Sequence, residues 1–448
     1  MGKPLLLRKV LGCVFLCCVP VCGTLLCCVA LRCIPVFALD EQSELKRLSD
    51  IHQMFLLRDA VSGHPQTSDF YSGEVACAFN HTAACEEKFK RILATEPKSP
   101  AAKRIHHILA YAALREGRYA RALREMDALL ALDPQDGDAK DTRPFVEGLS
   151  HFPDQAVEVS SATRATIPMG DGKLPLLING KTASYFIDTG ANLSTLSQSE
   201  VLRLGMEMRD VKSEGGSTDV NGSRVLFQIA LAKRLSVGGI VLNNVAFLVT
   251  SNQQPPFADM EPGERGLIGL PVLLALRSVK WGREGTFEAD RSPKPENITA
   301  ANVPAPKMAA ANLCFEDLML ITAATFKQHQ LPFVLDTGAV TTDLWPKFTG
   351  VAGELIRKSG SHEARAVTGM GGEQTFEAIS IPKVILRVGG EPVVLQPAHV
   401  LQVQQRSVGE WFYGNLGIDL LGRAKTVSFD FRTMRLRLYG IAEPAREK

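Results

Sequence analysis

The stretch "YFIDTGANLSTLS", residues 185–197, places a carboxylate directly after a run of apolar side chains. Its first three residues predict the end of a buried strand, and Asp188 follows them at once. A carboxylate that loses water at such a place needs hydrogen-bond partners or a chemical role. Asp188 is therefore a candidate functional residue.

A second copy of this stretch, "FVLDTGAVTTDLW", occupies residues 333–345. The tetrapeptide Asp-Thr-Gly-Ala begins at Asp188 and again at Asp336, an offset of 336 − 188 = 148 residues. The same offset relates the segments GLIG and GNLG (266–269 and 414–417) and the segments SVKW and TVSF (278–281 and 426–429). This fixed order of matching parts indicates an internal duplication. Two turns in related β domains would explain the duplication, but not why both copies place an aspartate after a buried strand.

Residues 163–288 and 312–441 have the pattern of two β-rich lobes. Short runs of Val, Ile, Leu and Phe alternate there with Asp-Gly, Asn-Gly and Gly-Gly pairs, which are typical of hairpin turns. The segment 289–311 between the lobes contains four prolines and few apolar side chains. It is therefore predicted to be a linker.

Residues 40–145 are predicted to be helical, because the segment 108–134 has apolar residues at helical spacing, interrupted at Gly117. This segment resembles one tetratricopeptide repeat, and residues 85–97 are similar to the second helix of a degenerate earlier repeat. Two poor repeats cannot build a long solenoid, which needs about three or more. A plain helical hairpin packed on the β lobes is the simpler alternative.

The N-terminus has the pattern of an export signal. A positively charged beginning precedes the uncharged apolar run of residues 10–31, and small side chains before residue 39 offer a cleavage site. Residues 1–38 are thus expected to be a signal peptide, or an uncleaved signal anchor that tethers the chain to a membrane. Either outcome places the rest of the chain in the periplasm or outside the cell.

Cysteine usage and charge narrow the partners of the chain. Seven of the ten cysteines lie in the N-terminal segment, so only Cys77, Cys85 and Cys314 remain beyond it. Cys77 and Cys85 could form a disulfide in an oxidising compartment, but two unpaired thiols on a helical hairpin fit the sequence equally well. Three cysteines without the Cys/His spacing of a zinc site argue against structural zinc. The net charge is +2 without a basic stripe, so nothing favours nucleic acid as a partner.

The two copies together resemble the retropepsin-like aspartic proteases, fused into one chain as in the pepsins. The resemblance covers about residues 165–440 and rests on the Asp-Thr-Gly-Ala motifs and on the apolar-apolar-Gly segments downstream. It implies a mainly β fold of two closed β-barrel lobes, here preceded by an α-helical hairpin region. The residues that it assigns to the site are Asp188 and Asp336 as the catalytic pair, with Thr189, Gly190, Thr337 and Gly338 supporting the active-site loops.

The chain departs from the pepsin pattern at several positions. Ala191 and Ala339 stand where pepsins have Ser or Thr, so the aspartate pair is expected to titrate at a higher pH than in a pepsin. The candidate flap of the first lobe, 213–225, lacks the tyrosine of the pepsin flap, and the candidate flap of the second lobe, 366–376, is rich in glycine. Asn415 replaces an apolar residue of the second downstream segment, which leaves the packing there open.

The resemblance implies an aspartic endopeptidase, a hydrolase that needs no cofactor and no metal. Two neighbouring carboxyl groups share one proton, so one can activate a water while the other protonates the scissile carbonyl. The expected partner is a peptide or protein substrate, and the expected state is a monomer. Two alternatives remain: a catalytically silent scaffold whose helical region mediates protein interactions, and a homodimer in which only one lobe is catalytic.

Overall fold

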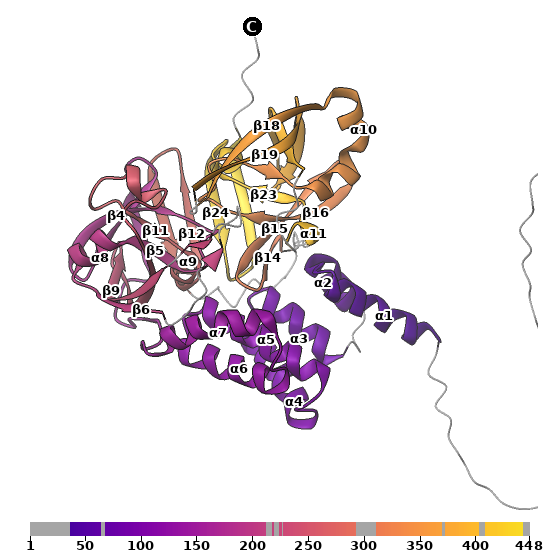
Figure 1. The fold of residues 1–448 in the computed structure, drawn as a ribbon, viewed down its shortest axis with the longest axis horizontal. Coiled ribbons are helices and arrows are strands. Elements are labelled where there is room, and N and C mark those ends of the chain that lie inside the picture. The colour runs from indigo at the N-terminus through magenta and orange to yellow at the C-terminus, as the bar shows by residue number, and fades with distance from the viewer. Residues whose placement is uncertain are drawn as a thin grey trace, which may run out of the picture. The chain divides into compact units, whose positions relative to one another are not determined.

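The computed structural model describes residues 36–63, 68–211, 217–218, 224–225, 227–292, 311–369, 372–402 and 408–441 (Figure 1). The chain divides into two units, Met1–Ser43 and Glu44–Lys448, and every described element except the start of helix α1 lies within the second unit. No helix of the described residues is long and apolar enough to cross a membrane. The apolar run 10–31 and most of the predicted linker, residues 293–310, lie outside the described residues.

Helices make up the described chain before the β lobes. Ser99 accepts a backbone hydrogen bond at the start of α5 and Pro100 follows it, both typical of a helix beginning. Gly117 follows α5 with a φ of 69°, a conformation that favours glycine, and the chain turns there into α6. A disulfide joins Cys77 to Cys85, so these two thiols are paired. The helices are α1 (Val36–Asp50), α2 (Met54–Gly63), α3 (Asp69–Ala78), α4 (Thr82–Thr95), α5 (Pro100–Arg115), α6 (Tyr119–Leu132) and α7 (Gly137–Ser150).

The first lobe is a small closed barrel. Six strands form a ring in the order β10-β5-β11-β4-β3-β9, which closes because β9 also pairs with β10. Side chains such as Tyr185, Phe247 and Ile268 fill it and are completely buried. The elements are β1 (Ala156–Val157), β2 (Arg164–Pro168), β3 (Lys173–Ile178), β4 (Lys181–Ile187), β5 (Ser194–Ser197), α8 (Gln198–Leu204), β6 (Glu207–Asp210), β7 (Ser217–Thr218), β8 (Arg224–Val225), β9 (Gln228–Val237), β10 (Ile240–Thr250), η1 (Phe257–Asp259), β11 (Gly266–Ile268), α9 (Leu270–Leu276), β12 (Ser278–Gly282) and β13 (Thr286–Asp290).

The second lobe repeats this strand order with its closing strands divided. The order β22-β17-β23-β16-β15-β20-β21 matches the first ring, with β21 and β22 together in place of β10. The strands β21 and β22 stand at the two ends of this order, and β21 continues into β22 across residues 396–397. The second ring is therefore closed by this chain connection, whereas the first is closed by the pairing of β9 with β10. The elements are β14 (Leu313–Glu316), β15 (Met319–Phe326), β16 (His329–Leu335), β17 (Asp343–Leu344), η2 (Pro346–Phe348), α10 (Thr349–Ser359), β18 (Ser361–Gly369), β19 (Gly372–Ile381), β20 (Val384–Val388), β21 (Glu391–Leu395), β22 (Ala398–Leu401), α11 (Val408–Trp411), β23 (Gly414–Leu416), α12 (Ile418–Leu421), β24 (Ala424–Asp430) and β25 (Arg435–Ile441).

A five-stranded sheet, in the order β2-β13-β12-β24-β25, joins the two lobes. In the antiparallel pair β12–β24, Lys280 lies opposite Ser428. These two residues are equivalent under the offset of 148, so the two copies meet around a local twofold axis. Trp281 and Phe429, which are also equivalent, stack with their ring centroids 5.1 Å apart. The duplication seen in the sequence is thus expressed as a symmetric junction.

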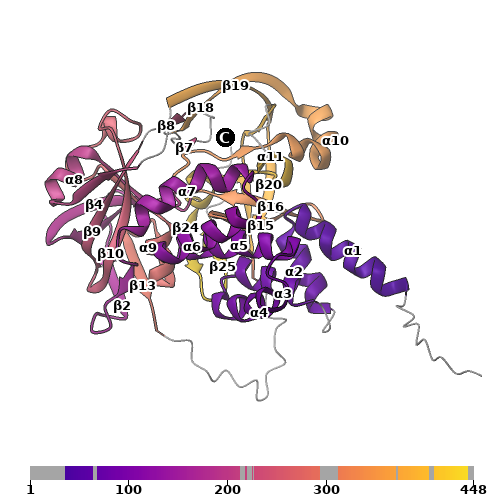
Figure 2. The same cartoon turned by 60° about the horizontal axis from the view of Figure 1, so that its bottom comes forward.

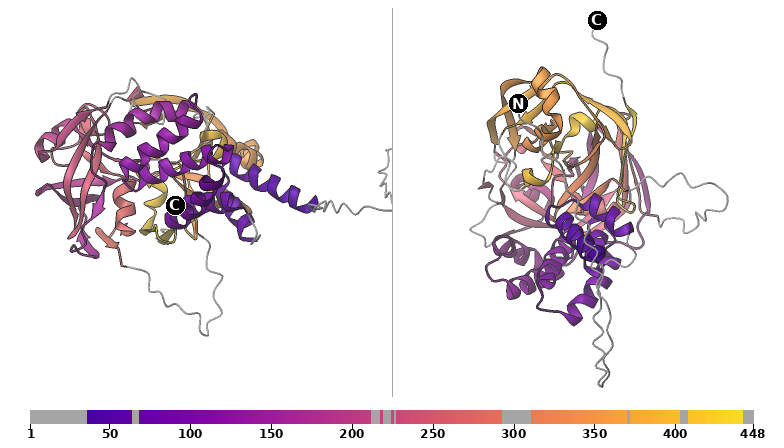
Figure 3. Two further views of the ribbon diagram at one scale, coloured as in Figure 1. Left: turned by 90° about the horizontal axis from the view of Figure 1, so that it is seen from below. Right: turned by 90° about the vertical axis from the view of Figure 1, so that its right-hand side faces the viewer.

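The helical region packs on both lobes. Tyr119 of α6 and Leu149 of α7 belong to one apolar cluster with Ile229 and Ala246 of the first lobe. These helices lie side by side, and they appear in purple in the turned views (Figures 2 and 3). Because this cluster is shared between the helices and the first barrel, the helices form part of the folded body of the protein.

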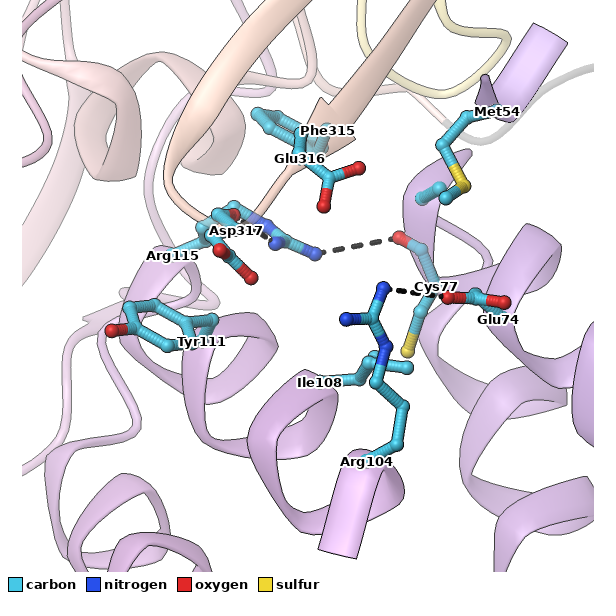
Figure 4. Close-up of a pocket in the computed structure, with 11 residues that line it drawn as sticks. Met54, Glu74, Cys77, Arg104, Ile108, Tyr111, Arg115, Phe315, Glu316 and Asp317 are labelled. Carbon is cyan, nitrogen blue, oxygen red and sulfur yellow. Dashed lines mark hydrogen bonds and ion pairs between the residues drawn. The ribbon is translucent and has the colours of Figure 1, made fainter. Parts of the chain in front are cut away.

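A small charged pocket lies where the helices meet the second lobe, between α3, α5 and the turn from β14 to β15 (Figure 4). Arg104 donates to Glu74 at 3.0 Å, and Arg115 donates to the backbone carbonyl of Asp317. Burial lowers the pKa of Arg115 to about 10. Two arginines here face three carboxyl groups, including that of Glu316. The charges are largely balanced, and the bond from Arg115 to Asp317 connects the helical region to the second lobe.

Candidate active site

Asp188 and Asp336 each follow a central barrel strand by one residue, at the ends of β4 and β16. One neighbour of each strand runs parallel to it, β11 beside β4 and β23 beside β16. The amide of Asp188 donates to the carbonyl of Ile268 at 2.9 Å, and that of Asp336 donates to the carbonyl of Leu416 at 3.0 Å. Each aspartate is therefore the last residue held by its sheet before the chain turns into a loop.

Each carboxylate is then held by its own loop. Oδ1 of Asp188 accepts the amides of Gly190 and Ala191 at 2.8 and 3.1 Å. Oδ1 of Asp336 accepts the corresponding amides of its own loop at 2.9 and 3.1 Å. These bonds orient the two carboxylates and replace part of the hydrogen bonds to water that each loses on burial. In each Asp-Thr-Gly motif, the loop amides thus bind Oδ1 of the aspartate and leave Oδ2 to other partners.

The two threonines tie the loops of the two lobes together. The amide of Thr189 donates to Oγ1 of Thr337, and the amide of Thr337 donates to Oγ1 of Thr189, both at 3.0 Å. Each hydroxyl then donates to a carbonyl of the other lobe, at 2.8 Å to Leu335 and at 2.7 Å to Ile187. Both threonines are buried. These four bonds cross between segments that are far apart in the sequence.

The glycines bring each loop against the aspartate of the other lobe. A methyl carbon placed on Gly190 would lie 2.5 Å from Cγ of Asp336, and one placed on Gly338 would lie 2.5 Å from Cγ of Asp188. Side-chain carbons do not approach this closely, so only glycine leaves room for the two carboxyl groups. The structure therefore brings all six predicted site residues into one place.

The pKa of Asp188 lies above the ordinary range of a carboxyl group. The largest cause is burial, which disfavours the charged form, followed by the charge of Asp336 and a hydrogen bond with its side chain. The amide of Gly190 opposes this shift. The pKa of Asp188 is thus raised because its carboxyl group is buried beside a second carboxyl group.

The tips of both loops face solvent. Gly190 and Gly338 are exposed, and Val340 is 77% exposed. In the part of the chain that the structure describes, no group of three or more His, Cys, Asp or Glu side chains could hold a metal ion. Asp188 and Asp336 themselves are half-buried beside these exposed tips.

The antiparallel hairpin β18–β19 contains the predicted flap of the second lobe, 366–376, except for residues 370–371, which lie outside the described residues. Most of its residues are exposed or half-buried, and the hairpin can be followed in orange in Figure 2. Arg365 ties it to Asp343 of β17 at 2.5 Å. The predicted flap of the first lobe, 213–225, lies largely outside the described residues.

Asn415 is a site residue that the sequence marked only as an irregularity. Its Nδ2 donates to Oδ2 of Asp336 at 3.1 Å. The equivalent position of the first lobe is Leu267, which is 7% exposed and offers no donor. The signal in the sequence was the polar residue in an otherwise apolar segment, but its direction toward Asp336 could not be read there.

The downstream glycines support the same loops. The amide of Gly269 donates to Oγ of Ser194 at 3.0 Å, and the amide of Gly417 donates to Oγ1 of Thr342 at 2.9 Å. A methyl carbon on Gly269 would lie 2.6 Å from the carbonyl oxygen of Ala191. The apolar-apolar-Gly segments therefore pass directly behind the active-site loops.

Comparison with known proteins gives a partial match. The family model described as Aspartyl protease matches residues 174–272, a range that includes Asp188 and Gly269. No curated protein matches the chain. The crystal structure of a retropepsin-like aspartic protease from Rickettsia conorii aligns with 30% of this chain and 94% of that chain, at 12% sequence identity and a TM-score of 0.20. The match to the family model lies within the first lobe and includes its Asp-Thr-Gly motif.

Proposed function

We propose that this chain is an aspartic endopeptidase whose catalytic pair is Asp188 and Asp336. The observation that carries the proposal is the contact between the two loops, in which each glycine abuts the carboxyl group of the opposite aspartate. The family match over the first lobe supports the same chemistry. One chain supplies both aspartates, which favours a monomeric enzyme.

In the proposed reaction the two carboxyl groups share one proton and hold a water between them. The ionised group takes a proton from this water, whose oxygen attacks the carbonyl carbon of the peptide bond. The protonated group gives its proton to the carbonyl oxygen, so a neutral tetrahedral diol forms. The diol then returns one hydroxyl proton to the pair, the pair protonates the amide nitrogen, and the C–N bond breaks. No covalent intermediate with the enzyme forms.

The proposed substrate is a peptide or an unfolded segment of a protein. Asp188 and Asp336 are half-buried beside exposed loop tips, and the hairpin β18–β19 is an extended element of the kind that can cover a bound strand. The disulfide between Cys77 and Cys85 fits an oxidising compartment, which supports the proposal that the chain is exported.

The test is peptide hydrolysis by the full chain and by the variants Asp188→Asn and Asp336→Asn. Asparagine keeps the shape of the side chain but cannot carry the shared proton, so each variant should lose about a thousandfold or more in kcat/KM. The double variant should be no worse than either single one, because the two residues act as a unit. Cleavage of a mixed peptide library is followed by mass spectrometry.

Asp259→Asn, which changes an exposed aspartate outside the site, is the matched control and should keep full activity. Hydrolysis that survives in both Asp188→Asn and Asp336→Asn would place the chemistry elsewhere. A full chain that cleaves nothing in the library would favour the silent scaffold.

A further inference from the structure

The two aspartates of the site are not equivalent. Asp336 accepts three N–H groups, two from its own loop on Oδ1 and one from Asn415 on Oδ2. Among the described residues, Asp188 accepts the two amides of its own loop and no third N–H group. The difference therefore comes down to one amide side chain.

Asn415 and Leu267 occupy equivalent places in the two lobes. Leu267 pairs with Phe186 in the parallel ladder of the first lobe, and Asn415 pairs with Val334 in the second. Both pairs obey the offset of 148 residues. The two lobes thus differ at this position only in the side chain, an amide in the second lobe and a leucine in the first. Leu267 therefore serves as an internal comparison for Asn415.

We propose that Asn415 is a positioning residue that makes Asp336 the ionised member of the pair and leaves the shared proton on Asp188. This inference rests on the proposed function and deepens it, since it assigns the base and the acid. An N–H donor stabilises a carboxylate relative to the neutral acid. The raised pKa of Asp188, caused mainly by burial and then by the charge of Asp336, points in the same direction.

The assignment fixes the path of each proton. Asp336 accepts a proton from the attacking water, while Asp188 donates its proton to the carbonyl oxygen of the substrate. Asp336 then holds the proton that passes to the amide nitrogen, and Asp188 recovers a proton from a hydroxyl of the diol. At the end the pair again holds one proton on Asp188.

A second titratable group, Asp343, lies beside Asn415. Asp343 lies opposite Asn415 in the antiparallel ladder and is bound by Arg365 at 2.5 Å. Burial raises the pKa of Asp343, while Arg365 and His399 oppose that rise and Asp419 adds to it. Because a substitution at Asn415 can also change the environment of Asp343, its effect must be measured on the titration of Asp188 and Asp336 themselves.

The side-chain amide of Asn415 has two possible orientations, and each gives a different assignment of the shared proton. Oδ1 of Asn415 is buried without a hydrogen-bond partner among the described residues. If the amide were turned over, Oδ1 would face Oδ2 of Asp336, and that oxygen would have to carry the proton. The two orientations thus predict opposite assignments, which an experiment can separate.

The direct test is a carbon NMR titration of the full chain with aspartate labelled at Cγ. The signals of Asp188 and Asp336 are assigned from Asp188→Asn and Asp336→Asn. Asp336 should ionise in the first step and Asp188 in a second step at higher pH. Ionisation of Asp188 in the first step would overturn the proposal. The titration reads protonation and not hydrolysis, so its result is independent of whether the chain proves to be a peptidase.

Variants that exchange the equivalent residues provide the causal test. Asn415→Leu should raise the first titration step by about one pH unit, because the donor to Asp336 is lost, and should leave the second step in place. Leu267→Asn should instead lower the second step, because it supplies a donor to Asp188. The double exchange Leu267→Asn/Asn415→Leu should restore the first step and reverse the order of the two aspartates.

Asn415→Ala serves as a second variant if the leucine does not fold, since alanine removes the amide without adding bulk. First and second steps that stay unchanged in whichever of these two variants folds would reduce Asn415 to a packing role and overturn the proposal. If the chain hydrolyses peptides, the acid limb of the kcat/KM profile should move upward with the first step.

Discussion

Gly190 and Gly338 carry no side chain, and this permits the carboxyl groups of opposite lobes to face one another. The nearest atoms to the missing methyl groups belong to Asp336 and Asp188. Neither glycine has a positive φ, so the backbone alone does not require glycine there. The requirement comes from the contact across the two lobes.

Gly190→Ala should therefore damage the site without damaging the fold. The added methyl group would force the Asp336 carboxyl group to move, and a displacement of about 1 Å can reduce activity about a hundredfold. The expected result is such a loss in kcat/KM with little change in Tm. Gly353→Ala, at a position of α10 with no atom near the added methyl group, is the control and should keep full activity. Unchanged activity in Gly190→Ala would contradict the described contact.

At the scale of elements, the site is two loops that emerge from equivalent barrel strands and are joined by hydrogen bonds. Thr337 accepts a bond from the amide of Thr189 and donates one to the carbonyl of Ile187. Both partners lie in the first lobe, so one hydroxyl group of the second lobe holds two groups of the other. These bonds hold the two loops, and with them the two aspartates, in a fixed position relative to each other.

Thr337→Ala should destabilise the protein, because it leaves a buried amide and a buried carbonyl without partners. The expected loss in the free energy of unfolding is about 2–4 kcal/mol, with a fall in kcat/KM as the loops separate. Thr337→Ser keeps the hydroxyl group and should lose less than half as much. Denaturant unfolding followed by circular dichroism measures both, and equal losses in the two variants would show that the methyl group, rather than the hydroxyl, matters.

At the scale of the whole molecule, the helical region is joined to the second lobe by pairs of a histidine and a carboxyl group. His107 of α5 binds Asp317 at 2.8 Å, and His52 binds Glu316 at 2.5 Å. Burial alone would lower the pKa of His107, but the hydrogen bond and charge of Asp317 outweigh it, so the pKa is raised. Burial would raise the pKa of Asp317, yet its bond with His107 holds it below the ordinary value.

The signs of these shifts define a pH window. The contribution of His107 is complete below its ordinary pKa of 6.5 and is lost as the pH rises through the raised value. The contribution of Asp317 is complete above its ordinary pKa of 3.8 and is lost as the pH falls through the lowered value. The pair should therefore stabilise the protein most between these two ordinary values.

His107→Gln should lower Tm most at about pH 5 and progressively less as the pH rises through the raised pKa of His107. Arg104, Asp138, His52 and Glu316 also interact with this pair and remain in the variant. His106→Gln is the control, since His106 binds Glu125 within the helical region at 2.8 Å and does not touch the second lobe through this bond. A difference in Tm that is independent of pH would show that the pair does not act through its charges.

The sequence by itself determined the features that repeat or alternate locally. The duplication with its offset of 148 identified Asp188 and Asp336 as a pair, and the strand and turn patterns indicated two β-rich lobes after a helical region. These signals are readable because a strand, a helix and a turn each depend on neighbours a few residues away. The two threonines and two glycines of the motifs came with the resemblance to a known family.

Only the tertiary structure decided which groups meet across the chain. It paired Cys77 with Cys85, placed Gly190 against Asp336, and directed the amide of Asn415 to Asp336 while its counterpart Leu267 stays apolar. It also showed that the helices share an apolar cluster with the first barrel. These contacts, most of them between residues far apart in the sequence, depend on how folded elements pack and leave no local pattern. The duplication therefore predicts a symmetric pair of aspartates, and the fold makes the two members different.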